Sequence, residues 1–313
     1  CLGLGNHYLR EKELEKAYNY GKQSMGCFQS INDSYQIGSA HFLLGIIYLR
    51  LADFDNAEKR FSRSLELARQ TDDQRAIFLR LSSLAGIACN KGDFDTAEKL
   101  YTESLKLCRS FKDQYYEAIL LNNLASVYHP LKQYDREEAV LKDSLDICRD
   151  IGDQEGEAVA LNNLGELALV QGNIKDAFEY SNEALHIARS LQDDWTVIAA
   201  YDILGNAYLA SQDISSAYQY FIQAIKRAYK IKAWDLLTRS MVNCAQVFLQ
   251  KSERDAARSL LEAAIAHPGI LYEYNLKARG LLKDMEITPS EEKTQELLIR
   301  ALERYFDLSI NEI

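Results

Sequence analysis

The chain repeats itself at a fixed interval of forty residues. The stretch LNNLASVY at 121–128 returns as LNNLGELA at 161–168. The same step connects Leu4, Leu44, Leu84, Leu124, Leu164, Leu204 and Cys244. The next residue is small in every unit: Gly5, Gly45, Ala85, Ala125, Gly165, Gly205 and Ala245. Self-similarity of this length, unbroken over seven units, predicts stacked supersecondary units rather than one compact core.

Each unit has the pattern of two helices joined by a short turn. In the second unit, apolar residues fall at helical spacing over 42–48 and again over 57–68. Small residues recur on both helices, such as Gly45 on the first and Ala57 on the second. They allow the two helices to approach closely, while larger neighbours such as Leu44 and Phe61 fill the remaining space. The sequence therefore predicts a helical hairpin in every unit.

Acidic and amide side chains stand where the helices should begin. Asp53, Asp93 and Asn173 lie in the turns between the two helices of a unit, and can cap the second helix. A second acid precedes each following first helix, at Asp33, Asp73, Asp113, Asp153 and Asp193. A carboxylate there accepts backbone N–H bonds and suits the positive end of the helix dipole.

The motif Leu44-Gly45-x2-Tyr48, followed by Ala57-x3-Phe61, resembles the tetratricopeptide repeat (TPR), whose pattern is W-x2-L-G-x2-Y, A-x3-F and a final Pro. The resemblance covers about 1–265 and implies an all-α fold, a right-handed α-solenoid of stacked helical hairpins. The Trp position is instead His41, Leu81, Leu121, Leu161, Tyr201 or Met241. The closing Pro is replaced by Arg69, Arg109, Arg149 and Arg189, so that the second helix can continue. The longer unit is similar to repeats of kinesin light chains, of mitotic-spindle adaptors and of bacterial signalling ATPases.

We divide the array into units at 1–39, 40–79, 80–119, 120–159, 160–199, 200–239 and 240–265. In the fourth unit Glu137 replaces the small Ala, and His129-Pro130 should end the first helix early, with a local kink. The segment 266–313 is a degenerate unit with a C-terminal capping helix. It should contain a helix over 272–283 and, after the cap signal Thr288-Pro289-Ser290-Glu291-Glu292, an amphipathic helix over 291–308. Such a segment can cover the last apolar face of a solenoid.

Composition narrows the function classes. The net charge is −10 and no basic block occurs, which argues against nucleic-acid and anionic-membrane partners. No apolar run approaches the roughly 20 residues that cross a bilayer. The chain begins inside a repeat helix without a signal peptide or a methionine, so we expect a piece of a longer protein. The six cysteines lack C-x-x-C spacing. Cys108 and Cys148 share a repeat position with Ala68 and Ala188, which predicts small core residues in a reducing compartment, the cytoplasm.

No catalytic constellation emerges. The five histidines form neither an H-E-x-x-H pair nor a metal-ligand set, and Gly3-x-Gly5 occupies repeat positions that helix packing explains. We therefore expect no enzymatic activity, cofactor or metal in this segment, although a nucleotide-hydrolysing domain could precede it. His129, on a first helix, is more simply interpreted as solvated or capped than as a ligand.

The resemblance also implies that first helices line a concave groove. The residues expected along its wall are Asn6, Arg10, Arg50, Asn122, Asn123, His129, Asn162, Asn163, Glu166, Asp202, Asn206 and Arg239. An asparagine offers both a donor and an acceptor, which match the alternating groups of an extended peptide. Alternatively, the asparagines bond the neighbouring helix and stiffen the stack, and one residue of each pair could serve each purpose.

The leading hypothesis is a protein- or peptide-binding module. The phrase LLEAAIAHPGILYEYNLKARGLLKDM is similar to the tail of repeat domains in bacterial signal-transduction ATPases with numerous domains, where the repeats act as a sensor. A ligand in the groove would then bias an upstream switch in such an ATPase or a transcriptional regulator. The alternatives are an adaptor that tethers partners without a switch, and an intracellular receptor for a short signalling peptide. The sequence indicates no oligomeric state.

Overall fold

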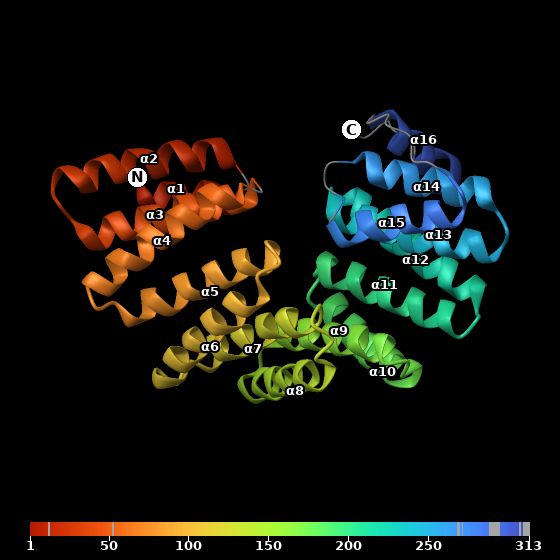
Figure 1. The fold of residues 1–313 in the computed structure, drawn as a ribbon, viewed down its shortest axis with the longest axis horizontal. Helices are drawn as coiled ribbons and strands as arrows, with labels where there is room; N and C mark the ends of the chain where they lie inside the picture. The colour runs from red at the N-terminus through yellow and green to blue at the C-terminus, as the bar shows by residue number, and fades with distance from the viewer. Residues whose placement is uncertain are drawn as a thin grey trace. The chain divides into compact units, whose positions relative to one another are not determined.

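The computed structural model describes residues 1–11, 13–51, 53–267, 270, 272–287, 295–306 and 308. Within these residues the chain forms 16 α-helices and no strand (Figure 1). It separates into two compact units, Cys1–Ile151 and Gly152–Ile313, each of which we describe by itself as the N-terminal and the C-terminal unit.

The N-terminal unit holds α1 (Leu2–Arg10), α2 (Leu14–Ser30), α3 (Ser34–Arg50), α4 (Phe54–Gln70), α5 (Gln74–Asn90), α6 (Phe94–Ser110), α7 (Gln114–Tyr128) and α8 (Tyr134–Ile151). The C-terminal unit holds α9 (Gln154–Val170), α10 (Ile174–Ser190), α11 (Asp194–Ala210), α12 (Ile214–Lys230), α13 (Trp234–Gln250), α14 (Arg254–Ala266), α15 (Tyr272–Asp284) and α16 (Gln295–Phe306). Odd-numbered helices up to α13 are the first helices of the repeats, and even-numbered helices up to α14 are the second helices.

The two helices of each repeat pack as an antiparallel hairpin, which confirms the predicted α-solenoid class (Figure 1). Starts of equivalent helices are forty residues apart, as at Phe54 and Phe94 or at Ser34 and Gln74. First helices therefore begin six residues before the limits that we drew at 40 and 80, and the division into numbered units stays a prediction. The second helices continue through Arg69, Arg109, Arg149 and Arg189, as their lack of a closing proline indicated.

Side-chain caps begin most helices. Asp33 accepts a bond from the backbone N–H of Gln36, and Asp53 accepts one from that of Asn56. The same arrangement recurs at Asp73, Asp93, Asp113, Asp153, Asn173, Asp193 and Asp213. The predicted caps are therefore confirmed, and each satisfies an N–H group that the helix itself leaves without a partner.

Most turns between helices reverse the chain through one residue in a left-handed conformation. Its φ is 71° to 78° where it is a glycine, at Gly92, Gly152 and Gly172. Its φ is 50° to 65° at Asn32, Asp72, Lys112, Lys132, Gln192, Gln212, Lys232 and Ser252. Because glycine tolerates this region without steric cost, the chain accepts a small strain at most of its turns.

The recurring small residues sit where two helices approach most closely. A Cβ atom added to Gly45 would lie 2.5 Å from the Phe61 ring, and one added to Gly205 would lie 2.6 Å from the Phe221 ring. Ala57 and Ala217, at the other conserved small position, are fully buried. The hairpins therefore pack as the repeat spacing predicted.

The fourth hairpin departs from its neighbours at its turn. Helix α7 ends at Tyr128 after 15 residues, whereas the other first helices from α3 to α13 have 17. Glu137 is buried at a position that elsewhere holds alanine, and its Oε1 lies 2.8 Å from Nδ1 of His129. Pro130 follows His129 and has no N–H to continue the helical hydrogen bonds, which accounts for the early end of α7.

Helices α15 and α16 cover the far side of the C-terminal unit. Ala278, Leu282, Leu298 and Leu302 join the same buried cluster as the side chains of α13 and α14. The predicted capping role is confirmed, with α15 over the expected range and α16 at Gln295–Phe306 within the expected 291–308. The cap signal at 288–292 lies outside the described residues.

Two predictions from composition can also be compared with the structure. Cys108 and Cys148 are buried in the core as expected, and none of the six cysteines forms a disulfide bond with another described residue. Among the helices that the structure describes, none has the length and apolarity needed to span a bilayer.

Candidate functional site

The residues predicted to line a groove do lie on or beside first helices. In the N-terminal unit these are Asn6 and Arg10 on α1, Arg50 on α3, Asn122 and Asn123 on α7, and His129 just after α7. In the C-terminal unit they are Asn162, Asn163 and Glu166 on α9, Asp202 and Asn206 on α11, and Arg239 on α13. Their surroundings differ between the two units, and only the C-terminal set belongs to a continuous polar arrangement.

The two asparagines of α9 have different surroundings. Asn162 is buried, and its Nδ2 donates to the backbone oxygen of Thr196 on α11 at 3.1 Å. Asn163 is half-buried. Because Asn162 bonds the next first helix, it stiffens the stack, which was one of the two interpretations of the asparagine pair. Asn163 keeps its predicted place at the surface.

An ion pair connects the next two first helices. Nε of Arg239 on α13 donates to Oδ2 of Asp202 on α11 at 2.8 Å, and the Ser240 hydroxyl donates to the same oxygen at 2.9 Å. Asp202 is only 3% exposed, so this carboxylate supports the helix packing and does not present a charge to solvent. The exposure expected for a groove-lining Asp202 is therefore not found.

The field around Arg239 is strongly negative. Burial by itself would lower the pKa of its guanidinium, but Asp202, Tyr274 and Glu166 outweigh burial and hold that pKa above its ordinary value. Glu166 is exposed on α9, so its carboxylate faces solvent while it contributes to this field. The guanidinium therefore stays charged and couples residues from α9, α11 and α13.

A third contact extends the arrangement to α15. Nζ of Lys277 donates to Oδ1 of the buried Asn243 on α13 at 2.8 Å. Together the contacts join helices α9, α11, α13 and α15. We call the residues that make them the polar row: Asn162, Thr196, Asp202, Arg239, Ser240, Asn243 and Lys277.

Some polar atoms of the polar row have no hydrogen-bond partner among the described residues. These buried atoms are Asn162 Oδ1, Asp202 Oδ1, Arg239 Nη2 and Asn243 Nδ2. The same holds for Nε2 of Gln246, one turn further along α13. Buried polar groups are normally paired, so hydrogen bonding within the described part of the C-terminal unit is incomplete at these atoms. Glu166, Asn206 and Gln246 share one repeat position on the same three helices and are exposed or half-exposed.

The predicted residues of the N-terminal unit form no comparable row. Asn6, Arg10 and Arg50 are exposed, and Asn122 and Asn123 are half-buried. His129 is held against Glu137 at the turn, which fits its interpretation as a satisfied histidine. Within the described residues, no group of three His, Cys, Asp or Glu side chains is placed to share a metal ion.

The groove residues predicted from the sequence omit four members of the polar row, Thr196, Ser240, Asn243 and Lys277. Ser240 stands at a repeat position that holds Ala160 and Ala200 in the preceding repeats, and this exchange of alanine for a hydroxyl was the available signal. Lys277 lies in the predicted helix over 272–283, but the repeat pattern has ended there. Its partnership with Asn243 could therefore not be aligned from the sequence.

Comparison with known proteins identifies the class. Residues 7–267 match the MalT-like TPR region, so the chain belongs to this family of tetratricopeptide repeat proteins. Among curated protein sequences, none matches the chain.

Three solved structures share the fold. Apo RapI is 16% identical with a TM-score of 0.71, and the match covers 90% of this chain and 97% of RapI. NprR in complex with its cognate peptide NprX is 15% identical with a TM-score of 0.65, over 98% of this chain and 84% of NprR. PH0952 of Pyrococcus horikoshii, a signal transduction ATPase with numerous domains and a tetratricopeptide repeat sensor, is 16% identical with a TM-score of 0.65. That match covers 91% of this chain but 42% of PH0952.

Proposed function

We propose that the chain is a peptide-binding module and that its ligand lies along the first helices α9, α11 and α13 of the C-terminal unit. The observation that supports the proposal is the set of exposed or half-exposed polar side chains on these helices, Asn163, Glu166, Asn206 and Gln246, in front of the polar row that joins the helices. An extended peptide presents N–H and C=O groups in alternation, so mixed donors and acceptors suit its main chain. This is the groove side expected from the repeat family.

The exposed part of the surface gives the ligand its chemistry. Glu166 is the acid that faces solvent there, beside the half-exposed Asn163 and Asn206. We infer a peptide that places a basic group near Glu166 and lays its main chain against the two amides. The polar row behind them fixes the spacing of the helices, so that little ordering remains to be done on binding.

We also propose that the module is the sensing part of a larger protein. The likeness to the PH0952 sensor supports a role as the sensing part of a signalling ATPase or transcriptional regulator, and the likeness to peptide-bound NprR supports a peptide as the ligand. No catalysis is proposed for this segment. Six cysteines that form no disulfide bond with another described residue suit a reducing location, and we propose the cytoplasm. A stand-alone adaptor is the alternative, in which the ligand binds without changing any upstream activity.

A peptide-library screen followed by titration of the full chain tests the proposal. The double variant Asn163→Ala with Asn206→Ala should weaken the selected peptide at least tenfold, with melting nearly unchanged. Asn182→Ala is the matched control, because Asn182 is exposed on the second helix α10. Asn162→Ala should instead lower the melting temperature, since Asn162 bonds α11. Equal peptide affinity in the double variant and the parent chain would remove the proposed surface.

A further inference from the structure

Arg80, in the N-terminal unit, breaks the repeat pattern at a buried position. The equivalent residues in the other repeats are small or apolar: Ala40, Leu120, Ala160, Ala200 and Ser240. Arg80 is nevertheless only 8% exposed. Its guanidinium lies over the Phe42 ring at 4.3 Å from the centroid, and its Nε donates to the Ser64 hydroxyl at 3.0 Å. The chain therefore holds a cation in a defined orientation where its other repeats hold none.

The rest of this guanidinium has no partner within the described residues. Nε of Arg80 donates a hydrogen bond to the Ser64 hydroxyl, and that hydroxyl donates one to the backbone oxygen of Gly38 at 2.7 Å. Asp73 is the neighbouring acid, but it caps α5 by accepting from the N–H of Ala76 at 3.0 Å, and it forms no ion pair with Arg80. Burial lowers the pKa of Arg80, which Asp73 and Tyr35 oppose. A buried charge without a close counterion is costly, and an arriving anion would relieve that cost.

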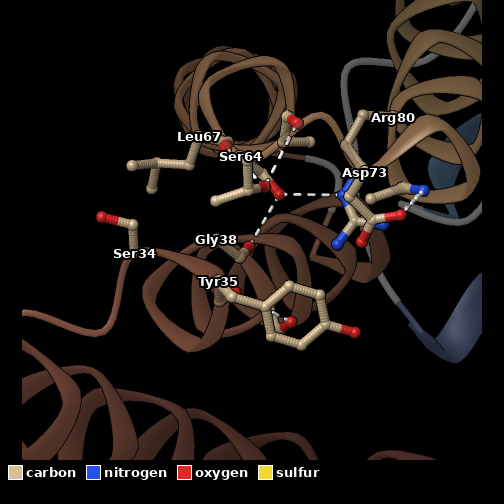
Figure 2. A pocket seen from close by; sticks show the side chains of 11 residues that line it. Ser34, Tyr35, Gly38, Ser64, Leu67, Asp73 and Arg80 are labelled. Carbon is tan, nitrogen blue, oxygen red and sulfur yellow. Dashed lines mark hydrogen bonds between the residues drawn. The ribbon is translucent and has the colours of Figure 1, made fainter.

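A hollow lies in front of the unpaired nitrogens, between α3, α4 and α5. Figure 2 shows the Arg80 guanidinium among Ser64, Gly38, Tyr35 and Asp73. The enclosed part of the hollow is small, about 10 Å³, which is room for about one water molecule, and the remainder opens to solvent. Gly38 lines this space, where other repeats carry Phe78, Ala118, Ala158, Ile198 or Thr238. Gly38 replaces a residue with a side chain, and Arg80 replaces a small or apolar residue. These two departures from the repeat pattern line the same hollow.

Two other hydroxyl groups at the hollow already donate to the backbone. Ser39 donates to the backbone oxygen of Tyr35 at 3.2 Å, and Thr71 donates to that of Leu67 at 3.0 Å. Arg80 is the positively charged donor that lines the space, and Ser34 and Tyr35 add hydroxyl groups. A guanidinium offers paired N–H groups in a planar fork, which matches the two oxygens of a carboxylate.

We propose that the hollow between α3, α4 and α5 binds the carboxylate of an aspartate or glutamate side chain of a polypeptide partner, with Arg80 as its anchor. One guanidinium with Asp73 nearby favours a monovalent anion over a phosphate dianion. The enclosed space admits little more than one water-sized group, so the carboxylate would meet Arg80 at the mouth of the hollow. This site lies within the N-terminal unit, and it stands or falls independently of the peptide surface on α9, α11 and α13.

Ligand-observed NMR on the full chain, at constant ionic strength and low chloride, tests the proposal. The probes are N-acetyl-glutamate amide, its neutral counterpart N-acetyl-glutamine amide, and inorganic phosphate. We expect the glutamate probe to bind with millimolar affinity and at least tenfold more tightly than the glutamine probe. Tighter binding of phosphate would overturn the carboxylate assignment, and equal binding of the two amides would overturn the site.

Matched variants locate the binding. Arg80→Gln should reduce affinity for the glutamate probe at least tenfold, whereas Arg75→Gln, an exposed arginine of the same helix α5, should leave it within twofold. Gly38→Ala places a methyl group in the hollow at 3.4 Å from Leu67 Cβ, so the fold is retained while binding should fall several-fold. This second variant decides the matter even if Arg80→Gln fails to fold. Unchanged binding in Gly38→Ala would contradict the proposal.

Discussion

Buried polar side chains bond the two helices of one hairpin in the N-terminal unit, whereas they bond one first helix to the next in the C-terminal unit. In the N-terminal unit, the hydroxyls of Ser64, Ser104 and Ser144 on second helices each donate to a backbone oxygen 26 residues earlier, on the first helix of the same hairpin. In the C-terminal unit the same repeat position holds Ala184, Ala224 and Ala264. Its polar contacts instead run from one first helix to the next, through Asn162, Asp202 and Asn243.

The apolar cores differ in the same sense. One large cluster extends through α10 to α16 in the C-terminal unit, whereas the N-terminal unit divides its core among smaller clusters. This continuous cluster, to which first helices α11 and α13 also contribute, can hold the C-terminal unit together. One repeat frame can therefore either bond each hairpin internally or bond successive first helices to one another.

Breaking the ion pair of the C-terminal unit should have the largest effect. Asp202→Ala leaves the Arg239 guanidinium buried without its counterion, which should cost about 3–5 kcal/mol of unfolding free energy. Urea denaturation of the full chain measures this. The double variant Asp202→Leu with Arg239→Met should recover most of the loss, because apolar residues of similar volume replace a buried pair well. A loss below ~1 kcal/mol in the single variant would show that the pair does not support the stack.

The N-terminal unit should show its own pH dependence, from His41. Burial lowers the pKa of His41 to about 4, Arg60 and Arg63 add to this, and its Nδ1 has no hydrogen-bond partner within the described residues. Between pH 6.5 and 4 the unfolded chain takes up a proton that the folded chain refuses, so stability falls as pH falls. Because the ring is only half-buried, we expect a loss of about 1–2 kcal/mol.

His41→Leu should remove this component. Leucine occupies the same repeat position at 81, 121 and 161, so the substitution fits the packing. Denaturation curves of the two proteins at pH 7 and pH 4.5 separate the contribution of His41 from that of the carboxylates. If the variant and the parent chain lose the same free energy, His41 is already protonated or hydrogen-bonded in the fold.

Exchanging the serine and alanine of the two units should have the smallest effect. Ser104→Ala removes one buried hydrogen bond and should cost about 0.5–1.5 kcal/mol. Ala224→Ser introduces a hydroxyl 26 residues after Ile198, the spacing at which the serines of the other unit find a backbone acceptor. We therefore expect less than the ~1–3 kcal/mol that an unsatisfied buried hydroxyl costs. Thermal melting measures both, and a larger loss for Ala224→Ser would show that the hairpins of the two units differ in geometry.

Much of the fold could be predicted from the sequence because the repeat fixes local chemistry. Caps such as Asp73, close contacts such as Gly45 on Phe61, and the early end of α7 each depend on residues near in sequence or one helix away. The division of roles within the asparagine pair could not be predicted. Asn162 and Asn163 are adjacent, and which one turns inward depends on the backbone oxygen of Thr196 on the next first helix.

Charged residues were the harder part of the candidate site. Asp202 and Arg239 were each expected at a groove wall, but their mutual pairing buries the carboxylate. The burial of Arg80 could not be predicted from the sequence, because one arginine on a helix normally extends to solvent. Its significance depends on Gly38 and Phe42, which are far from it in sequence and adjacent in the fold.

Backbone amide NMR on the full chain, titrated with a peptide selected from the library, tests the proposed ligand surface most directly. We expect the largest chemical-shift changes on α9, α11 and α13, around Asn163, Glu166 and Asn206. Changes confined to the second helices α10, α12 and α14, or to the N-terminal unit, would contradict it.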